Sequence, residues 1–174
     1  MRYIVLVAIS LLSVLLTGGV FAQLPIIGAN LDIVLAAMIA MEAAEGGITP
    51  VIYFSVASIS LDVLIGSTIG MYSFPCAVAG IAAYFVFAKF KGMKFTTILA
   101  VGGGAWVIKE ILMSIMTLFM GYSFDFTSIL VRSILPGIPL QAAITFGIYC
   151  LMALLYRRPF MHPLPPPRSS DTVL

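Results

Sequence analysis

Six ionisable side chains stand within long apolar stretches of this chain, where hydrocarbon side chains are expected: Asp32, Glu42, Asp62, Lys109, Glu110 and Arg132. A charged group at the centre of a membrane-spanning helix costs about 2.5–3.5 kcal/mol on insertion scales. Such groups therefore pair with one another or line a polar cavity. The chemistry that these residue types allow is ion pairing, either to fix helix register or to bind a ligand or partner.

The sequence offers no constellation for catalysis. The single histidine, His162, lies in a Pro-rich C-terminal segment, and no hydroxyl or thiol stands beside a base at a usable spacing. Cys76 and Cys150 lie in apolar runs and are expected to be small core residues. A Walker loop and a metal-ligand cluster are also missing from the sequence. We therefore expect a protein that is not an enzyme and uses no cofactor or metal.

The composition places these charges in a membrane protein. The chain is 61% hydrophobic and only 9% charged, with a mean hydropathy of +1.15, whereas a soluble domain averages about 25% charged residues. Its net charge of +2 is small, and the basic residues are spread over separate loops. This pattern argues against a nucleic-acid-binding surface.

Six apolar segments are long enough to cross a bilayer, which needs about 20 residues of helix. We predict an all-α protein with spans at about 3–21, 26 or 31 to 44, 49–65, 70–88, 95–120 and 126–156. The last span is expected to be kinked or broken at Pro136 and Pro139, which remove two backbone donors. Residues 1–158 form the predicted transmembrane domain, and residues 159–174 form a Pro-rich tail without fixed structure.

The N-terminal segment has a second interpretation. Val20-Phe21-Ala22-Gln23 places small residues where a signal peptide is cleaved. We favour a first membrane span. The second span is expected to begin near Asn30, a good helix cap, and to end at Gly46-Gly47.

The basic residues predict the orientation of the spans. They fall before the first span, between the fourth and fifth, and after the sixth: Arg2; Lys89, Lys91 and Lys94; Arg157, Arg158 and Arg168. With six spans, all of these lie on one side, so the positive-inside rule predicts that both termini are cytoplasmic. The loops on the other side are very short. Glu42 and Glu45 then lie at a cytoplasmic helix end, where they are expected to be solvated.

The same topology gathers five charges in the outer half of the membrane: Asp32, Asp62, Lys109, Glu110 and Arg132. Lys109 and Glu110 are adjacent and point about 100° apart on a helix, so we predict that they do not pair directly. We predict instead that Lys109 meets Asp62 or Asp32, and that Glu110 meets Arg132.

The acidic residue of the third span needs the most explanation. Asp32 is near a helix N-terminus, where the dipole favours an anion, but Asp62 is near a C-terminus, where the dipole disfavours it. Asp62 is expected to be one half of a buried pair that positions the outer turn after it. That turn is the candidate contact with a partner, through Gly66, Ser67, Thr68 and Gly70.

Small residues recur four apart in the second and fourth spans, as in Ala36 and Ala40 and in Cys76 and Gly80. Such faces allow close contact between helices in a membrane. The triplet 102–104, three glycines in the fifth span, is expected to serve packing more than flexibility.

Three segments together resemble the MreD family, the small integral membrane subunit of the bacterial rod-shape (elongasome) system. They read LPIIGANLDIVL at 24–35, SLDVLIGSTIG at 60–70 and PGIPLQAAITFGIYCLMALLYRR at 136–158. Leu31 stands where the family usually has proline before Asp32, and Thr68 replaces the proline of the turn. Length, span number and orientation fit the family over nearly the whole chain.

This resemblance implies a non-enzymatic scaffold in the bacterial inner (cytoplasmic) membrane. Its direct partner would be an MreC-like bitopic membrane protein, which has one span and a large extracytoplasmic part. Through that partner it would connect MreB filaments with RodA and a class B penicillin-binding protein, and so support lateral peptidoglycan synthesis and cell shape. The fold is similar to that of the substrate-binding subunit of energy-coupling-factor vitamin transporters. Vitamin binding, in an outer pocket around Trp106, is therefore the alternative function.

Overall fold

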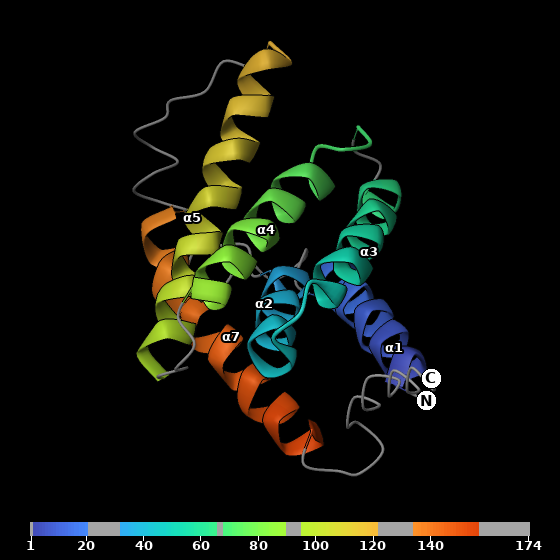
Figure 1. Cartoon of the computed structure of the whole chain (residues 1–174). Helices are drawn as coiled ribbons and strands as arrows, with labels where there is room; N and C mark the ends of the chain where they lie inside the picture. The colour runs from blue at the N-terminus through green and yellow to red at the C-terminus, as the bar shows by residue number, and fades with distance from the viewer. Residues whose placement is uncertain (1, 21–31, 66–67, 90–94, 122–133, 157–174) are drawn as a thin grey trace, which may run out of the picture.

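The computed structural model describes residues 2–20, 32–65, 68–89, 95–121 and 134–156, and all elements in these ranges are helical. The helices are α1 Arg2–Leu15, which continues into the π-helical turn η1 Leu16–Val20, α2 Ile33–Glu45, α3 Thr49–Ile65, α4 Ser73–Lys89, α5 Phe95–Phe119 and α7 Leu135–Tyr156 (Figure 1). The prediction of an all-α protein is confirmed for this part of the chain. The predicted C-terminal tail lies outside it.

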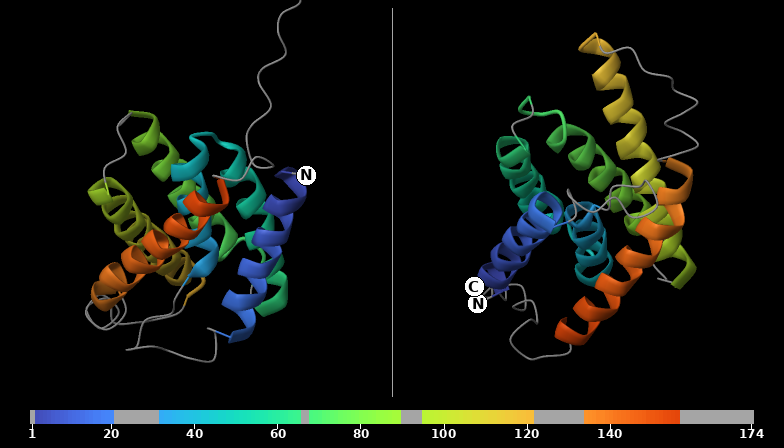
Figure 2. Two further views of the ribbon diagram at one scale, coloured as in Figure 1. Left: turned by 90° about the horizontal axis from the view of Figure 1, so that it is seen from below. Right: turned by 180° about the vertical axis from the view of Figure 1, so that it is seen from behind.

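The short helix α2 is the centre of the bundle. It contacts α1, α3, α4, α5 and α7, while these five helices contact one another in the order α1, α3, α4, α5, α7. Figure 2 accordingly shows α1 and α3 on one side of the bundle and α5 and α7 on the other. Every residue of α2 from Val34 to Ala43 is buried. A helix that is apolar on nearly all sides is buried, either among other helices or in lipid.

The surrounding helices expose large apolar side chains. Leu11 of α1, Val63 of α3, Phe85 of α4, Phe119 of α5 and Leu154 of α7 are all exposed. Two helical stretches, Phe95–Phe119 and Leu135–Leu154, are long and apolar enough to cross a membrane. Apolar helices of 10–17 residues cover Leu6–Gly19, Thr49–Leu64 and Ser73–Lys89.

Both ends of α2 are capped by short-range hydrogen bonds. Asp32 is the N-cap, and its side-chain Oδ1 accepts from the backbone N–H of Leu35 at 2.9 Å. Gly46 ends the helix in the left-handed region at φ 71°, and its N–H donates to the carbonyl of Glu42. The predicted end at Gly46 is confirmed. The predicted start near Asn30 is wrong, because the carboxylate two residues later caps the helix.

The proline motif of the last helix marks its beginning. The sequence predicts a kink or a break at Pro136 and Pro139. The helix α7 runs without a break from Leu135 to Tyr156, so Pro139 does not interrupt it; the part of the predicted span before residue 134 lies outside the described residues. Pro136 lies in the first turn, where the N–H has no partner within the helix, so its loss is tolerated. Pro139 removes a single backbone hydrogen bond close to the same end.

Glycines let the helices of the bundle approach closely. A Cβ at Gly80 of α4 would overlap the side chain of Met38 on α2. A Cβ at Gly102 of α5 would lie 3.0 Å from Thr145 of α7, and one at Gly103 would lie 3.1 Å from Ile138. The prediction that these small residues serve packing is confirmed at these three positions.

Candidate functional site

A buried polar network joins the starts of α2 and α4 to the middle of α5. Its first member is Asp32, which is buried at the N-cap of α2. While its Oδ1 caps the helix, its Oδ2 lies 3.0 Å from Nζ of Lys109 on α5. The sequence leaves Asp32 and Asp62 as alternative partners of Lys109, and the structure selects Asp32.

The backbone of Asp32 is held by a residue that the sequence interpretation missed. Gln141 of α7 accepts from the Asp32 N–H at 3.3 Å and donates to the Asp32 carbonyl at 2.8 Å. Gln141 is buried, so its amide has given up water for these two bonds. A glutamine within an apolar span was the available signal. The pair fixes the start of α2 against α7.

Lys109 lies between two aromatic rings as well as two carboxylates. Its Nζ is 4.8 Å from the ring centre of Tyr72 and 4.9 Å from that of Trp106. It also lies 3.4 Å from Oε1 of Glu110. The prediction that Lys109 and Glu110 do not pair is therefore wrong. The long, flexible lysine stem lets the ammonium reach sideways to the neighbouring position despite the 100° between their Cα–Cβ directions.

Asp62 orders the turn that follows it, as predicted, but it does so by accepting backbone N–H groups. Its side chain is 0% exposed, and its two oxygens accept backbone N–H bonds from Gly70 at 3.0 Å, Tyr72 at 2.9 Å and Ser73 at 3.1 Å. The ion pairs of Lys109 in the described residues are with Asp32 and Glu110. Asp62 thus stabilises the turn and the beginning of α4.

The position of Asp62 at the end of α3 is explained by the helix that follows. The dipole of α3 disfavours an anion there, but the first N–H groups of α4 are unpaired donors at the positive end of the next helix. The carboxylate satisfies these donors directly. Gly70 adopts φ 100° in this turn, a conformation that side-chain-bearing residues rarely adopt.

The rest of the predicted outer turn is described in part. Thr68 and Ile69 are exposed, and the Thr68 carbonyl accepts from the N–H of Met71 at 3.0 Å. Gly66 and Ser67 lie outside the described residues. So does Arg132, the predicted partner of Glu110.

Tyr72 connects the two carboxylates into one network. Its backbone N–H donates to Asp62, and its ring contacts the ammonium of Lys109, which in turn pairs with Asp32. The two acidic residues that the sequence singled out therefore act on neighbouring helix starts. Each one orders the beginning of a helix.

Glu42 is the charged residue whose surroundings differ most from the prediction. The sequence predicts a solvated side chain, yet Glu42 is only 1% exposed. Within the described part of the chain, neither of its carboxyl oxygens has a hydrogen-bond partner. The prediction of solvation is wrong, because α2 is surrounded on all sides by other helices as far as Ala43. Glu45, one turn later, is partly buried.

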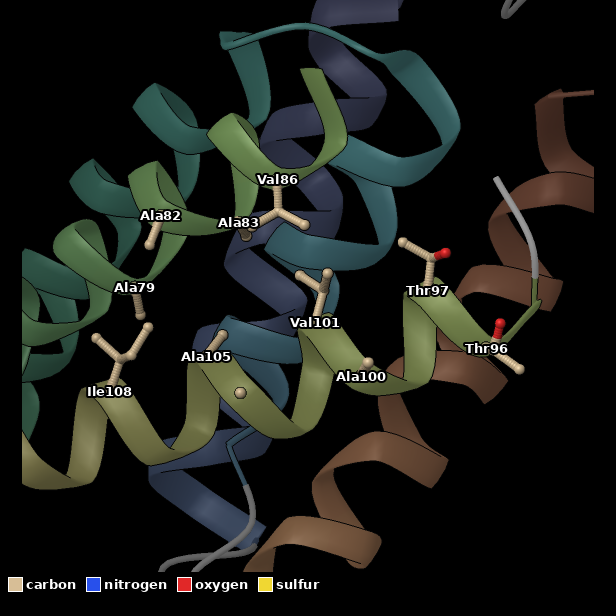
Figure 3. Close-up of a pocket in the computed structure, with 11 residues that line it drawn as sticks. Ala79, Ala82, Ala83, Val86, Thr96, Thr97, Ala100, Val101, Ala105 and Ile108 are labelled. Carbon is tan, nitrogen blue, oxygen red and sulfur yellow. The ribbon is translucent and has the colours of Figure 1, made fainter. Parts of the chain in front are cut away.

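An open, apolar groove of about 480 Å³ lies apart from this network, between α4 and α5 (Figure 3). Trp106 does not line it. The indole of Trp106 is buried between Lys109 and α7, where a Cβ at Gly137 would overlap it. The space around Trp106 is therefore filled by protein atoms.

The network has the features of a structural element. Within the described ranges, no group of three or more His, Cys, Asp or Glu residues could hold a metal ion. Its charges pair with one another and with backbone groups. Comparisons with protein-family models, with curated proteins and with solved structures found no match for the chain.

Proposed function

We propose that this chain is a non-enzymatic integral membrane scaffold of the bacterial rod-shape system, similar to MreD, and that it binds an MreC-like bitopic partner. The observation that carries the proposal is the joint role of Asp32 and Asp62. These are the acidic residues of the two MreD-like motifs. Each of them orders the start of a helix, and Lys109 and Tyr72 connect them.

The arrangement of helices supports a multi-pass topology. We propose that α1 with η1, α2, α3, α4, α5 and α7 belong to six successive spans with both termini in the cytoplasm. The exposed apolar side chains of the outer helices then face lipid. The central helix α2 has only 13 residues, but its neighbours shield it from lipid, so it need not match the bilayer thickness alone.

A scaffold of this shape needs a partner with a soluble domain. The turn between α3 and α4 is short, and its exposed part includes Thr68 and Ile69. Asp62 holds this turn in place through the Gly70 and Tyr72 N–H groups. In the proposed topology the turn faces outward, where the partner's extracytoplasmic segment begins. The partner then reaches the peptidoglycan synthases RodA and the class B penicillin-binding protein, and MreB filaments lie on the cytoplasmic side.

Vitamin binding is the weaker alternative. It requires an outer cavity around Trp106, and this indole instead packs against Lys109 and Gly137. The groove between α4 and α5 is lined by apolar and small side chains with two threonines at one end. The groove thus has few of the polar groups that fix a small polar ligand. The charged groups beside Trp106, Lys109 and Asp32, pair with each other.

Co-purification tests the proposed partner. The full chain is expressed with the MreC-like protein of the same organism, solubilised in mild detergent and captured by an affinity tag. We expect the partner to be retained, and Ile69→Glu to reduce its recovery, because Ile69 is 72% exposed on the turn. Ile48→Glu is the matched control, since Ile48 is 48% exposed at the opposite end of α3. Absence of the partner from the purified wild-type chain would contradict the proposal.

A further inference from the structure

The groove between α4 and α5 is built from small side chains on both helices. Ala79, Ala82, Ala83 and Val86 line it from α4, and seven residues of α5 line the other side, among them Ala100, Gly104 and Ala105. Figure 3 shows these side chains facing the space between the two ribbons. Gly104 has open space where its Cβ would be, with no atom within 4 Å. The groove is thus open, and it runs along the surface of the bundle between α4 and α5.

One end of the groove is lined by two threonines, and α4 ends in a lysine one turn beyond the lining residue Val86. Lys89 is exposed at the last position of α4, three residues after Val86 and therefore on the same face of the helix. Thr96 and Thr97 lie in the first turn of α5, and Figure 3 shows both at this end of the groove. The first N–H groups of α5 are unpaired donors at the positive end of its dipole. The sequence that joins the two helices, residues 90–94, contains two more lysines.

The size of the groove limits its occupant. Residues 96–108 of α5 span about 18 Å at the helical rise per residue. A helix about 10 Å across and equally long has a volume of about 1,400 Å³, so it would lie mostly outside the groove of about 480 Å³. A single acyl chain is much thinner. Half of a bilayer core about 30 Å thick is about 15 Å, which matches the length of the groove.

We propose that this groove binds an anionic phospholipid of the cytoplasmic leaflet. One acyl chain lies between Ala82 and Gly104, and the phosphate lies against Lys89, Thr96 and the N-terminus of α5. Charge complementarity selects the headgroup, since basic residues at the cytoplasmic ends of membrane helices attract anionic lipids. The small side chains that line the groove leave room for the acyl chain. The proposal rests on the proposed topology, in which α4 and α5 lie in the membrane and are joined on the cytoplasmic side, but it does not depend on any protein partner.

Lipid binding to the purified full chain tests the headgroup contact. Delipidated protein in detergent is titrated with dioleoyl phosphatidylglycerol or with dioleoyl phosphatidylcholine, and bound lipid is counted by native mass spectrometry. We expect the anionic lipid to bind more tightly. Lys89→Gln should weaken its binding about five-fold, whereas Lys89→Arg should retain it. Equal binding of the two lipids to the wild-type protein would overturn the proposal.

Filling the groove tests the acyl-chain contact. Gly104→Leu places a side chain into the open space of the groove and should lower phosphatidylglycerol binding about ten-fold or more. A ten-fold loss of affinity corresponds to about 1.4 kcal/mol of binding free energy. Gly147→Leu is the matched control, because Gly147 of α7 is also exposed with no atom near its Cβ position. Trp106 fluorescence checks that both variants fold.

Two results at this position would contradict the assignment. Unchanged lipid binding in Gly104→Leu would show that lipids bind only around the whole protein. Loss of a single-span partner on Gly104→Leu, with lipid binding unchanged, would assign the groove to a protein helix. Neither result changes the test of the scaffold function, which compares the partner recovered with the wild-type chain and with Ile69→Glu.

Discussion

Replacing Asp62 by asparagine should destabilise the bundle without involving Lys109. The carboxylate accepts three backbone N–H bonds, two at Oδ2 from Gly70 and Ser73 and one at Oδ1 from Tyr72. Asparagine keeps one oxygen, and its NH₂ group would face at least one of these donors. A hydrogen bond to a charged group is worth about 1.5–3 kcal/mol. We therefore expect Asp62→Asn to lower the free energy of unfolding by about 2–4 kcal/mol.

Double-mutant cycles separate this role from ion pairing. Lys109→Met is combined with Asp32→Asn in one cycle and with Asp62→Asn in another. The 3.0 Å contact of Lys109 with Asp32 predicts a coupling energy of about 1–3 kcal/mol in the first cycle. The second cycle should show a smaller coupling, below about 1 kcal/mol, because Asp62 binds backbone N–H groups of the turn and is connected to Lys109 only through Tyr72.

The sole tryptophan makes the assay local. Trp106 is buried with its ring 4.9 Å from Nζ of Lys109, so its fluorescence reports unfolding at the network itself. Unfolding by denaturant in mixed detergent micelles gives the free energies. A coupling of Asp62 with Lys109 that equals or exceeds that of Asp32 with Lys109 would refute this division of roles.

The same unfolding assay checks three further positions. Gln141→Leu should destabilise by about 1–3 kcal/mol, because it leaves the buried backbone N–H of Asp32 without its acceptor, while the Asp32 carbonyl keeps the bond from the Ala36 N–H; an unchanged midpoint would contradict this. Gly102→Ala should destabilise by about 1–3 kcal/mol through overpacking against Thr145 and should be rescued by Thr145→Ala, whereas Gly104→Ala should be nearly neutral. Glu42→Leu should raise stability by about 1 kcal/mol or more, because both carboxyl oxygens are buried without a hydrogen bond. A loss of similar size would show that the Glu42 carboxyl has a stabilising contact.

Hydrophobic runs and their end signals predicted most helix boundaries. The third predicted span, residues 49–65, coincides with α3, and the fifth, residues 95–120, differs from α5 by one residue. Gly46 was recognised as a helix end, since a glycine after an apolar run is a strong local signal. These features depend on nearby residues, so the sequence alone determines them.

The partners of the buried charges depended on distant residues. The cost of an unpaired charge predicted that Lys109 would have an acidic partner on another helix, and Asp32 is that partner. It could not predict that Asp62 would bind backbone N–H groups, because such donors have no sequence signature. Gln141 and Glu42 were missed or misjudged for a related reason. Their environments follow from which helix occupies the centre of the bundle, and the apolar periodicity of a membrane helix does not reveal this.

The network explains how short connections could present a fixed surface on the side that the proposed topology places outward. Asp32 and Asp62 each use a carboxylate to satisfy the first donors of a helix, and Lys109 and Tyr72 keep the two starts together. A rigid turn between α3 and α4 is then available to a partner without a large loop. This is the physical basis for the scaffold function that we propose.

Cell shape after gene deletion tests that function most directly. The gene is removed from its rod-shaped host. It is then replaced by the gene for the wild-type chain, for Asp62→Asn or for the control variant Ile48→Glu, and cell width is measured by microscopy. We predict rounded cells on deletion, rescue by the wild-type chain and by Ile48→Glu, and poor rescue by Asp62→Asn at equal membrane abundance. Cells that keep a normal rod shape and width without the gene would contradict the proposed function.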